Sequence, residues 1–485
     1  MNFMEHLKNE MNYTKTTNGA VAYKSTLNEV VDLFGQIGSM RYRTPKDKCV
    51  LFENAFTVDR ELAMKILFYN RDCRGGQGER QTFRDIYIHL VNLDTQVAIN
   101  NIDNIVEFGR WDDLIDIAYK CKNLKFTRNA ITYIKIMLDL DLACDNPTSL
   151  LGKWLPSINA SNKETIAKGK WIAQKLGYTP KKYRKTLSYL RNKIRIIENN
   201  LREKDYSEIK YEQVPSLAIN KYRRAFYRND EEKFNEYLED VKSGRKEIKA
   251  STLYPYDIVR SYLQEHKINT VLEEQWKALP DYLNGVECKS LVVADVSGSM
   301  YGFPINVSIS LALYLSERIK GAYANKFITF DTNPKLVEIN SKSSLYAKIN
   351  KVYNADWGGS TNIEKVFNLI LKIAKDKNLQ QSDLPEQVIV ITDMNFDMSI
   401  YKNKQTLFKN IGDKFKQNEY KLPKLIWWNV NATNEVFPMK ADENCQYVSG
   451  ASPSIMKAVI EGKMLSAIDL IKQTVLVDRY SIIKF

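Results

Sequence analysis

Residues 290–300 read Ser-Leu-Val-Val-Ala-Asp-Val-Ser-Gly-Ser-Met, and this stretch decides the fold of the C-terminal part of the chain. The apolar run at residues 291–294 is typical of a strand that is buried on both faces of a parallel sheet. The residues that follow place one carboxylate and two hydroxyls in the turn that leaves this strand. Because ligands bind open α/β sheets at the carboxyl ends of strands, this turn predicts a binding site.

Two later segments supply further oxygen ligands. A loop of small residues carries Ser360 and Thr361, and a second buried-strand pattern at residues 387–392 is followed directly by Asp393. Hard oxygen ligands suit Mg²⁺, which we expect first, or Mn²⁺ or Ca²⁺, and the absence of nearby His or Cys argues against zinc. The alternative is that the two aspartates only cap helices and Thr361 fills a turn. The predicted metal ligands are Asp295, Ser297, Ser299, Thr361 (or Ser360) and Asp393.

The order of these parts resembles the metal-ion-dependent adhesion site of von Willebrand factor A domains. That resemblance implies one ion with an open coordination position, which accepts a Glu or Asp carboxylate of a protein partner. Two positions depart from the family's pattern: Met394 stands where a small residue is usual, and Ser360 separates Thr361 from the two glycines before it. Neither change removes an oxygen ligand.

Residues 286–485 alternate between strand and helix patterns, which predicts a doubly wound, mostly parallel sheet. A capped helix is expected after Ser452, with Pro453 in its first turn. The apolar tail at residues 475–485 is expected to pack, and docking on the helical part is one way it can do so. The strand candidates are residues 291–294, 326–330, 388–392, 424–430 and 446–449.

Residues 1–285 show helix patterns joined by tight turns, which favours antiparallel helix pairs stacked as an α-solenoid. No clean sequence period is present, so the repeats would be degenerate. We therefore predict a HEAT-like α-helical solenoid domain at residues 1–285, followed by an α/β von Willebrand factor A-like domain at residues 286–485. The clearest helix patterns cover residues 57–69, 82–90, 104–118 and 131–138.

Composition limits the classes of function. The 485 residues are 44% hydrophobic, enough for large cores, and they show neither a membrane-length apolar stretch nor a signal peptide. The six cysteines are scattered, as in a reduced cytoplasmic protein. Only three histidines occur, none near the metal motif, so we expect no enzyme. Metal-dependent hydrolysis is the least favoured reading, since one ion without a general base is predicted.

Positive charge is concentrated in one part of the chain. The net charge is +13, and residues 151–200 hold twelve Lys or Arg against two acids. Helical spacing over residues 181–195 separates an apolar stripe from a basic side, which favours phosphate contact over a merely solvated face. The basic side consists of Lys181, Arg184, Arg191 and Arg195.

A second candidate for phosphate contact is the glycine-rich loop at residues 71–84. Its three glycines permit close backbone approach, and Arg71, Arg74 and Arg80 lie around them. The loop lacks the Gly-Lys-Ser/Thr ending of a P-loop. The alternative, a sharp turn between helices with Arg80 paired to Asp85 or Asp72, stays open.

A helical-repeat half followed by a von Willebrand A-like half resembles the Ro autoantigen (TROVE-type) proteins, which are ring-shaped RNA-binding scaffolds. Four motifs are more similar to an uncharacterised family of the same architecture in plants, bacteria and large viruses. The resemblance implies a monomeric, non-enzymatic, cytoplasmic RNA-binding scaffold with a metal site for an acidic protein partner. The alternative is an interaction or assembly module, viral or cellular, that binds no RNA. The motifs are residues 70–80, 108–114, 214–216 and 295–300.

Overall fold

The computed structural model describes residues 3–194, 196–283, 289–330, 333–353, 361–398, 406–441, 443–461 and 465–485. The chain divides into two compact units. The first comprises Met1–Ile66, Gly75–Gln77 and Leu253–Val477, and the second comprises Leu67–Arg74, Gly78–Thr252 and Asp478–Phe485. The boundaries of these units differ from those of the two predicted domains, because N-terminal segments and the helices after Leu253 pack with the sheet.

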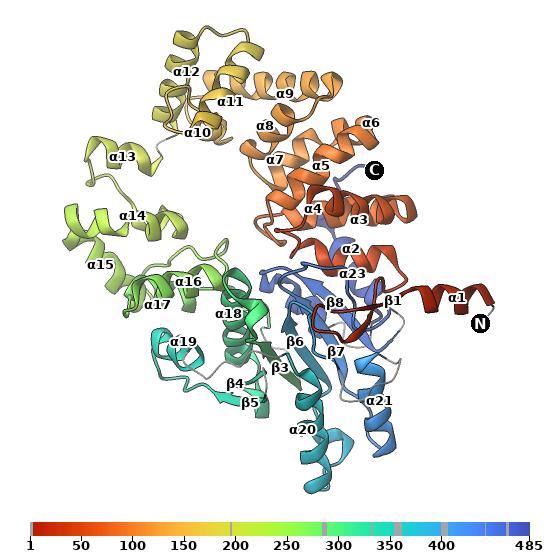
Figure 1. Cartoon of the computed structure of the whole chain (residues 1–485). Coiled ribbons are helices and arrows are strands. Elements are labelled where there is room, and N and C mark those ends of the chain that lie inside the picture. Colours follow the sequence, from red (N-terminus) through yellow and green to blue (C-terminus); the bar gives the residue numbers. More distant parts are fainter. Residues whose placement is uncertain are drawn as a thin grey trace. The chain divides into compact units, whose positions relative to one another are not determined.

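A six-stranded sheet forms the centre of the first unit, in the order β5-β4-β3-β6-β7-β8 (Figure 1). All neighbouring strands are parallel except β5, which pairs antiparallel with β4 at one edge. The prediction of an α/β region with a mainly parallel sheet after a helical region is confirmed. The strands are β3 (Ser290–Asp295), β4 (Lys326–Phe330), β5 (Lys335–Glu338), β6 (Gln387–Thr392), β7 (Lys424–Asn429) and β8 (Cys445–Ser449).

The two central strands bring the predicted ligands to one edge. Every residue of β3 and β6 is buried, as their continuous apolar sequences require. Leu291 lies opposite Val388 and Ala294 opposite Ile391, so the carboxyl ends of β3 and β6 are neighbours. The turns that leave these strands therefore begin side by side.

Helices of the first unit cover this sheet. α18 packs against β3, β4 and β6, and α2 packs against β7 and β8. The helices are α1 (Phe3–Met11), α2 (Glu29–Ile37), α3 (Pro45–Val58), α16 (Pro255–Glu265), α17 (Thr270–Lys277), α18 (Phe303–Arg318), α19 (Leu345–Tyr353), α20 (Ile363–Asp376), α21 (Leu407–Gln417), α22 (Met456–Glu461) and α23 (Ala467–Val475). The helical turn expected after Ser452 is present, since the Ser452 hydroxyl accepts from the Ser454 N–H at 3.3 Å.

A small antiparallel hairpin, β1 (Tyr13–Lys15) and β2 (Val21–Tyr23), also belongs to the first unit. Tyr23 and Phe437 exchange two backbone hydrogen bonds of 2.9 Å, which join β2 to the segment after β7. The hairpin was not predicted, because strands of three residues leave no pattern in a sequence.

The second unit is helical, and helices that follow one another along the chain pack together. The prediction of a mostly helical N-terminal region is confirmed. α4 begins in the first unit and ends in the second. The helices are α4 (Arg60–Arg71), α5 (Gln81–Leu93), α6 (Thr95–Asn100), α7 (Ile102–Phe108), α8 (Trp111–Lys120), α9 (Leu124–Ala143), α10 (Leu151–Trp154), α11 (Lys163–Lys175), α12 (Pro180–Lys193), α13 (Ile197–Glu203), α14 (Ser216–Asn229) and α15 (Glu231–Lys242).

The C-terminal tail packs on these helices, as expected. Arg479 donates to Asp72 with Nη2 at 2.7 Å from Oδ1, and the Tyr480 hydroxyl donates to the same carboxylate at 3.0 Å. Further along, the Asn101 side chain donates to the Lys484 carbonyl at 2.8 Å. None of the helices in the described part of the chain is both long enough and apolar enough to cross a membrane.

Candidate metal centre and basic surfaces

Asp295 and Asp393 occupy the adjacent ends of β3 and β6, and both side chains are buried. Asp295 accepts the Ser297 backbone N–H at 2.9 Å through Oδ1. This bond curls the turn so that the hydroxyl oxygens of Ser297 and Ser299 lie 3.2 Å apart. The structure thus brings four of the predicted ligands to one edge of the sheet.

The electrostatics of this pair suit a cation. Burial, followed by the negative charge of nearby Asp393, raises the pKa of Asp295 above its usual range. Within the described residues, no three His, Cys, Asp or Glu side chains gather as a metal cluster. An ion held here would therefore need hydroxyl oxygens besides the two carboxylates, and Ser297 and Ser299 offer them. The donor set fits a hard divalent cation.

Thr361 is buried and is tied to the loop that follows β6. Its backbone N–H donates to Asp397 Oδ2 at 2.8 Å, and its carbonyl accepts the Asp397 N–H at 3.1 Å. The Thr361 hydroxyl accepts from the Asn18 side chain at 3.4 Å. Ser360, the alternative ligand, lies outside the described residues.

Two features of this edge escaped prediction. The Thr392 hydroxyl donates to Asp295 Oδ2 at 2.6 Å, so the last residue of β6 orients the carboxylate of β3. A polar residue ending an otherwise apolar strand was the available signal. Met394, directly after the second aspartate, has a left-handed φ of +66°, a conformation that side chains with a Cβ rarely adopt.

The basic helix α12 has the predicted two sides. Tyr183, Leu187 and Leu190 are buried, whereas Lys181 and Arg184 are exposed. These two cations form no ion pair with any residue that the structure describes. Arg195 lies outside the described residues.

Arg191 is placed differently from its predicted partners. Its guanidinium donates to the Gly152 carbonyl at 3.0 Å, the Ser157 hydroxyl at 2.8 Å and the Leu155 carbonyl at 2.8 Å. Burial lowers the pKa of this guanidinium. Its donors bind α10 and the residues that follow it, so Arg191 does not belong with the exposed cations of α12.

We therefore expect Arg191→Lys to destabilise the helical unit by about 1–3 kcal/mol, because one ammonium group cannot replace a planar fork with three partners. Thermal melting followed by circular dichroism measures this, with Arg184→Lys as the matched control on the same helix. An unchanged melting temperature in Arg191→Lys would show that these three hydrogen bonds do not stabilise the helical unit.

The three arginines predicted in the glycine-rich loop differ in burial. Arg71 is only 2% exposed, and its Nη2 lies 2.7 Å from Asp113 Oδ2, so its guanidinium is paired inside the protein and does not lie on the surface with the other two arginines. Arg74 and Arg80 remain exposed. Arg80 lies 3.6 Å from Asp112, a different partner from those weighed in the sequence.

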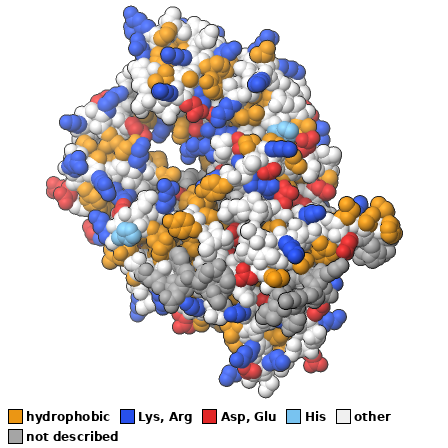
Figure 2. Space-filling model, viewed as in Figure 1, with side chains coloured by type: hydrophobic (Ala, Val, Ile, Leu, Met, Phe, Trp, Pro, Cys, Tyr) orange, Lys and Arg blue, Asp and Glu red, His pale blue; other side chains and the backbone are white. Residues whose placement is uncertain are grey.

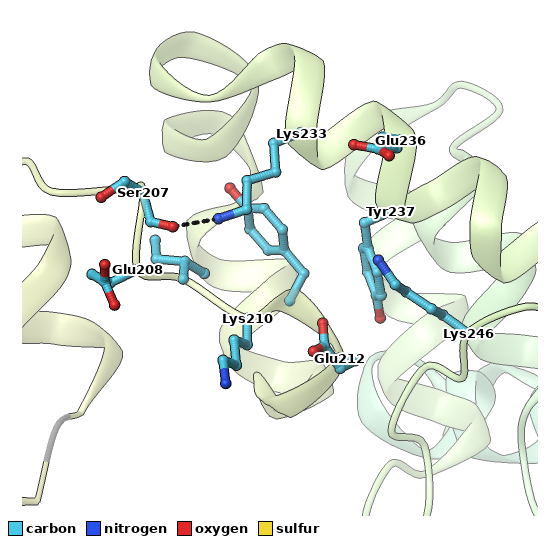
Figure 3. Close-up of a pocket in the computed structure, with 10 residues that line it drawn as sticks. Ser207, Glu208, Lys210, Glu212, Lys233, Glu236, Tyr237 and Lys246 are labelled. Carbon is cyan, nitrogen blue, oxygen red and sulfur yellow. Dashed lines mark hydrogen bonds between the residues drawn. The ribbon is translucent and has the colours of Figure 1, made fainter.

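Two pockets of the helical unit differ in charge. One, of about 290 Å³, is lined by three lysines and three glutamates, and Lys233 Nζ donates to the Ser207 carbonyl at 2.6 Å across it (Figure 3). The other, of about 380 Å³, lies along α9 and the end of α11 and has no acidic lining residue. Its residues are Leu124, Thr127, Arg128, Ile131, Thr132, Lys135 and Lys175.

The fold and the site define a protein with a helical region and an α/β region that carries a candidate metal centre. Residues 16–136 and 134–285 match the domain of unknown function DUF2828, and residues 289–478 match the domain of unknown function DUF7788. Because the first match covers more than half of the chain, the protein belongs to the DUF2828 family. The chain is 28% identical to Uncharacterized protein L728 of Acanthamoeba polyphaga mimivirus, over 95% of this chain and 86% of that protein.

Proposed function

We propose that this protein is a non-enzymatic, cytoplasmic RNA-binding scaffold that also holds a divalent ion for contact with a protein partner. In this proposal the α/β region is a von Willebrand factor A-like domain, and the helices form a HEAT-like solenoid similar to that of Ro proteins. The observation that supports the ion site is the pair of buried aspartates at the adjacent ends of β3 and β6.

The metal would be held by carboxylates and hydroxyls of three loops. When bound, the ion would supply a positive charge and an open coordination position. A Glu or Asp carboxylate of the partner would occupy that position. Mg²⁺ is expected first, with Mn²⁺ or Ca²⁺ as alternatives. No His lies in these loops, and in this proposal the site serves binding rather than hydrolysis. The proposed ligands are Asp295, Ser297, Ser299, Thr361 and Asp393.

RNA would be held by the helical unit, where cations lie among apolar side chains. Figure 2 shows Lys and Arg side chains interleaved with hydrophobic ones over its α9–α12 part. The α9 pocket combines Arg128, Lys135 and Lys175 with Leu124, which is 77% exposed. The three cations suit phosphates and the apolar side chains suit unpaired bases, whereas the balanced pocket of Figure 3 offers no net charge to a polyanion.

The RNA proposal predicts a loss of salt-dependent affinity when exposed cations are removed. Lys181→Ala/Arg184→Ala should lower affinity for a generic single-stranded RNA. The log–log salt slope should fall by ~0.7 per lost contact, hence ~1.4 if both engage. Filter binding at several salt concentrations measures this, and adding Arg128→Ala/Lys135→Ala tests the α9 pocket in the same way.

The matched control is Lys372→Ala/Lys375→Ala, which removes two exposed cations of α20 in the α/β region. An equal loss in this control would mean that binding is non-specific. If the wild-type protein binds no RNA at low salt, the RNA proposal fails and an assembly module without RNA becomes the better account.

A further inference from the structure

The turn between β1 and β2, residues 16–19, lies against the loop that follows β6. The Thr16 hydroxyl donates to the Phe396 carbonyl at 2.6 Å, and the Met398 N–H donates to the Asn18 carbonyl at 3.2 Å. Gly19 and Asp397 form an antiparallel bridge. The loop at residues 393–398 begins with Asp393, a proposed metal ligand. The hairpin, although it lies near the start of the sequence, therefore contacts the loop that carries this ligand.

One side chain of this turn joins two of the proposed ligand loops. Asn18 Nδ2 donates to the Asn395 carbonyl at 2.7 Å and to the Thr361 hydroxyl at 3.4 Å. Asn395 in turn donates its N–H to Asp393 Oδ1 at 3.1 Å. Asn18 is therefore one hydrogen bond from Thr361 and two from Asp393. It is exposed, whereas Thr361 beneath it is 1% exposed.

The turn is fixed on both sides of Asn18. Thr16 accepts the Ala20 N–H through its hydroxyl at 2.9 Å and donates its own N–H to the Ala20 carbonyl at 2.9 Å. Gly19 has a φ of +89°, a conformation that favours glycine. Beyond the turn, Tyr23 is bonded to Phe437. The amide of Asn18 is thus presented to Thr361 by a closed, anchored turn and not by a free terminus.

We propose that Asn18 is a positioning residue of the metal centre, and that ion binding and docking of the β1–β2 hairpin are coupled. By donating to Thr361 and to the Asn395 carbonyl, Asn18 holds Thr361 and the loop after β6 in one arrangement. Residues that orient metal ligands typically contribute 10- to 100-fold to affinity. Coupling is reciprocal, so an ion that needs this arrangement also stabilises the docked hairpin.

The inference rests on the proposed metal site and is tested on the full-length protein with Mn²⁺ alone. Asn18→Ala should weaken Mn²⁺ binding about tenfold, measured by electron paramagnetic resonance, while the melting temperature without metal stays unchanged. Asn434→Ala is the matched control, because Asn434 donates to Thr17 of the same turn at 2.9 Å without touching Thr361. Its Mn²⁺ affinity should equal that of the wild type.

Hydrogen exchange of backbone amides gives a second test. If Asn18 only stabilised the fold, adding metal would not change the exchange rates of the hairpin. In the wild type, Mn²⁺ should slow exchange of the amides of residues 13–23, and in Asn18→Ala this protection should be lost. Equal affinity in wild type and Asn18→Ala, an equal loss in Asn434→Ala, or no metal-dependent protection would each overturn the coupling while the metal site stands. Absence of Mn²⁺ binding by the wild type would overturn the metal site itself.

Discussion

Asp113→Ala should lower the free energy of unfolding of the helical unit by about 3–5 kcal/mol, the usual cost of breaking a buried ion pair. Asp113 is fully buried, and its carboxylate accepts Arg71 Nε at 2.8 Å and Arg84 Nε at 2.7 Å. It also accepts the Arg110 N–H at the start of α8 at 3.0 Å. Among the described residues, Asp113 is the carboxylate that pairs with Arg71, so alanine would leave the buried guanidinium without that partner.

Urea unfolding followed by far-ultraviolet circular dichroism measures this effect as a lower midpoint of the helical transition. Asp139→Ala is the matched control, an exposed aspartate of α9, and should change stability by no more than about 0.5 kcal/mol. Asp113→Asn, which keeps the shape but not the charge, should fall between the two. An unchanged midpoint in Asp113→Ala would show that the pair is not buried in solution.

Asp113 also explains why the chain breaks between α7 and α8, a helix boundary that the apolar periodicity did not predict. The apolar pattern at residues 104–118 predicts one helix, yet the structure has α7 and α8 separated at Gly109. A Cβ at Gly109 would lie 2.6 Å from Asp113 Oδ2, so glycine is needed where the chain passes this carboxylate. Such a constraint comes from tertiary packing and leaves no period in the sequence.

The central strands of the sheet could be predicted because they are buried on both faces and therefore contain uninterrupted apolar runs. Edge elements lack this signal: β5 is mostly exposed, and it was not predicted. The order of the strands could not be read from the sequence either, since it depends on which apolar surfaces pack together.

Some residues of the candidate site could likewise be predicted from the sequence, and others could not. Asp295 and Asp393 were predictable because each directly follows a buried apolar run, Asp295 as the last residue of β3 and Asp393 as the first residue after β6. Asn18 was not, because it reaches Thr361 from 343 positions earlier in the chain through a hairpin with no sequence pattern. Arg191 is the opposite case, a residue that a sequence pattern assigned to a surface on which its side chain does not lie. Helical spacing groups it with Lys181, but its guanidinium is held by two carbonyls and one hydroxyl that lie 34–39 positions earlier in the chain.

Excess Mg²⁺ or Mn²⁺ should raise the stability of the α/β region of the wild-type protein, and Asp295→Ala should abolish this effect. A ligand that binds only the folded state stabilises it by about 2.7 kcal/mol at one hundred times its Kd. Asp295 is fully buried beside Asp393, so its removal takes one of two carboxylates from the proposed centre. Because hydroxyls alone bind hard cations weakly, the remaining Ser297 and Ser299 should not hold the ion.

Melting curves with and without excess metal measure this effect, and elemental analysis of the purified protein gives an independent reading. Asp376→Ala serves as the control, since it removes an exposed aspartate at the end of α20 and should leave the metal-dependent shift intact. The variant Asp295→Ala should still melt cooperatively without metal, because the loss is confined to the turn after β3. A wild-type protein that shows neither a metal-dependent shift nor bound metal would refute the proposed centre, and the two aspartates would then be explained by turn and helix capping alone.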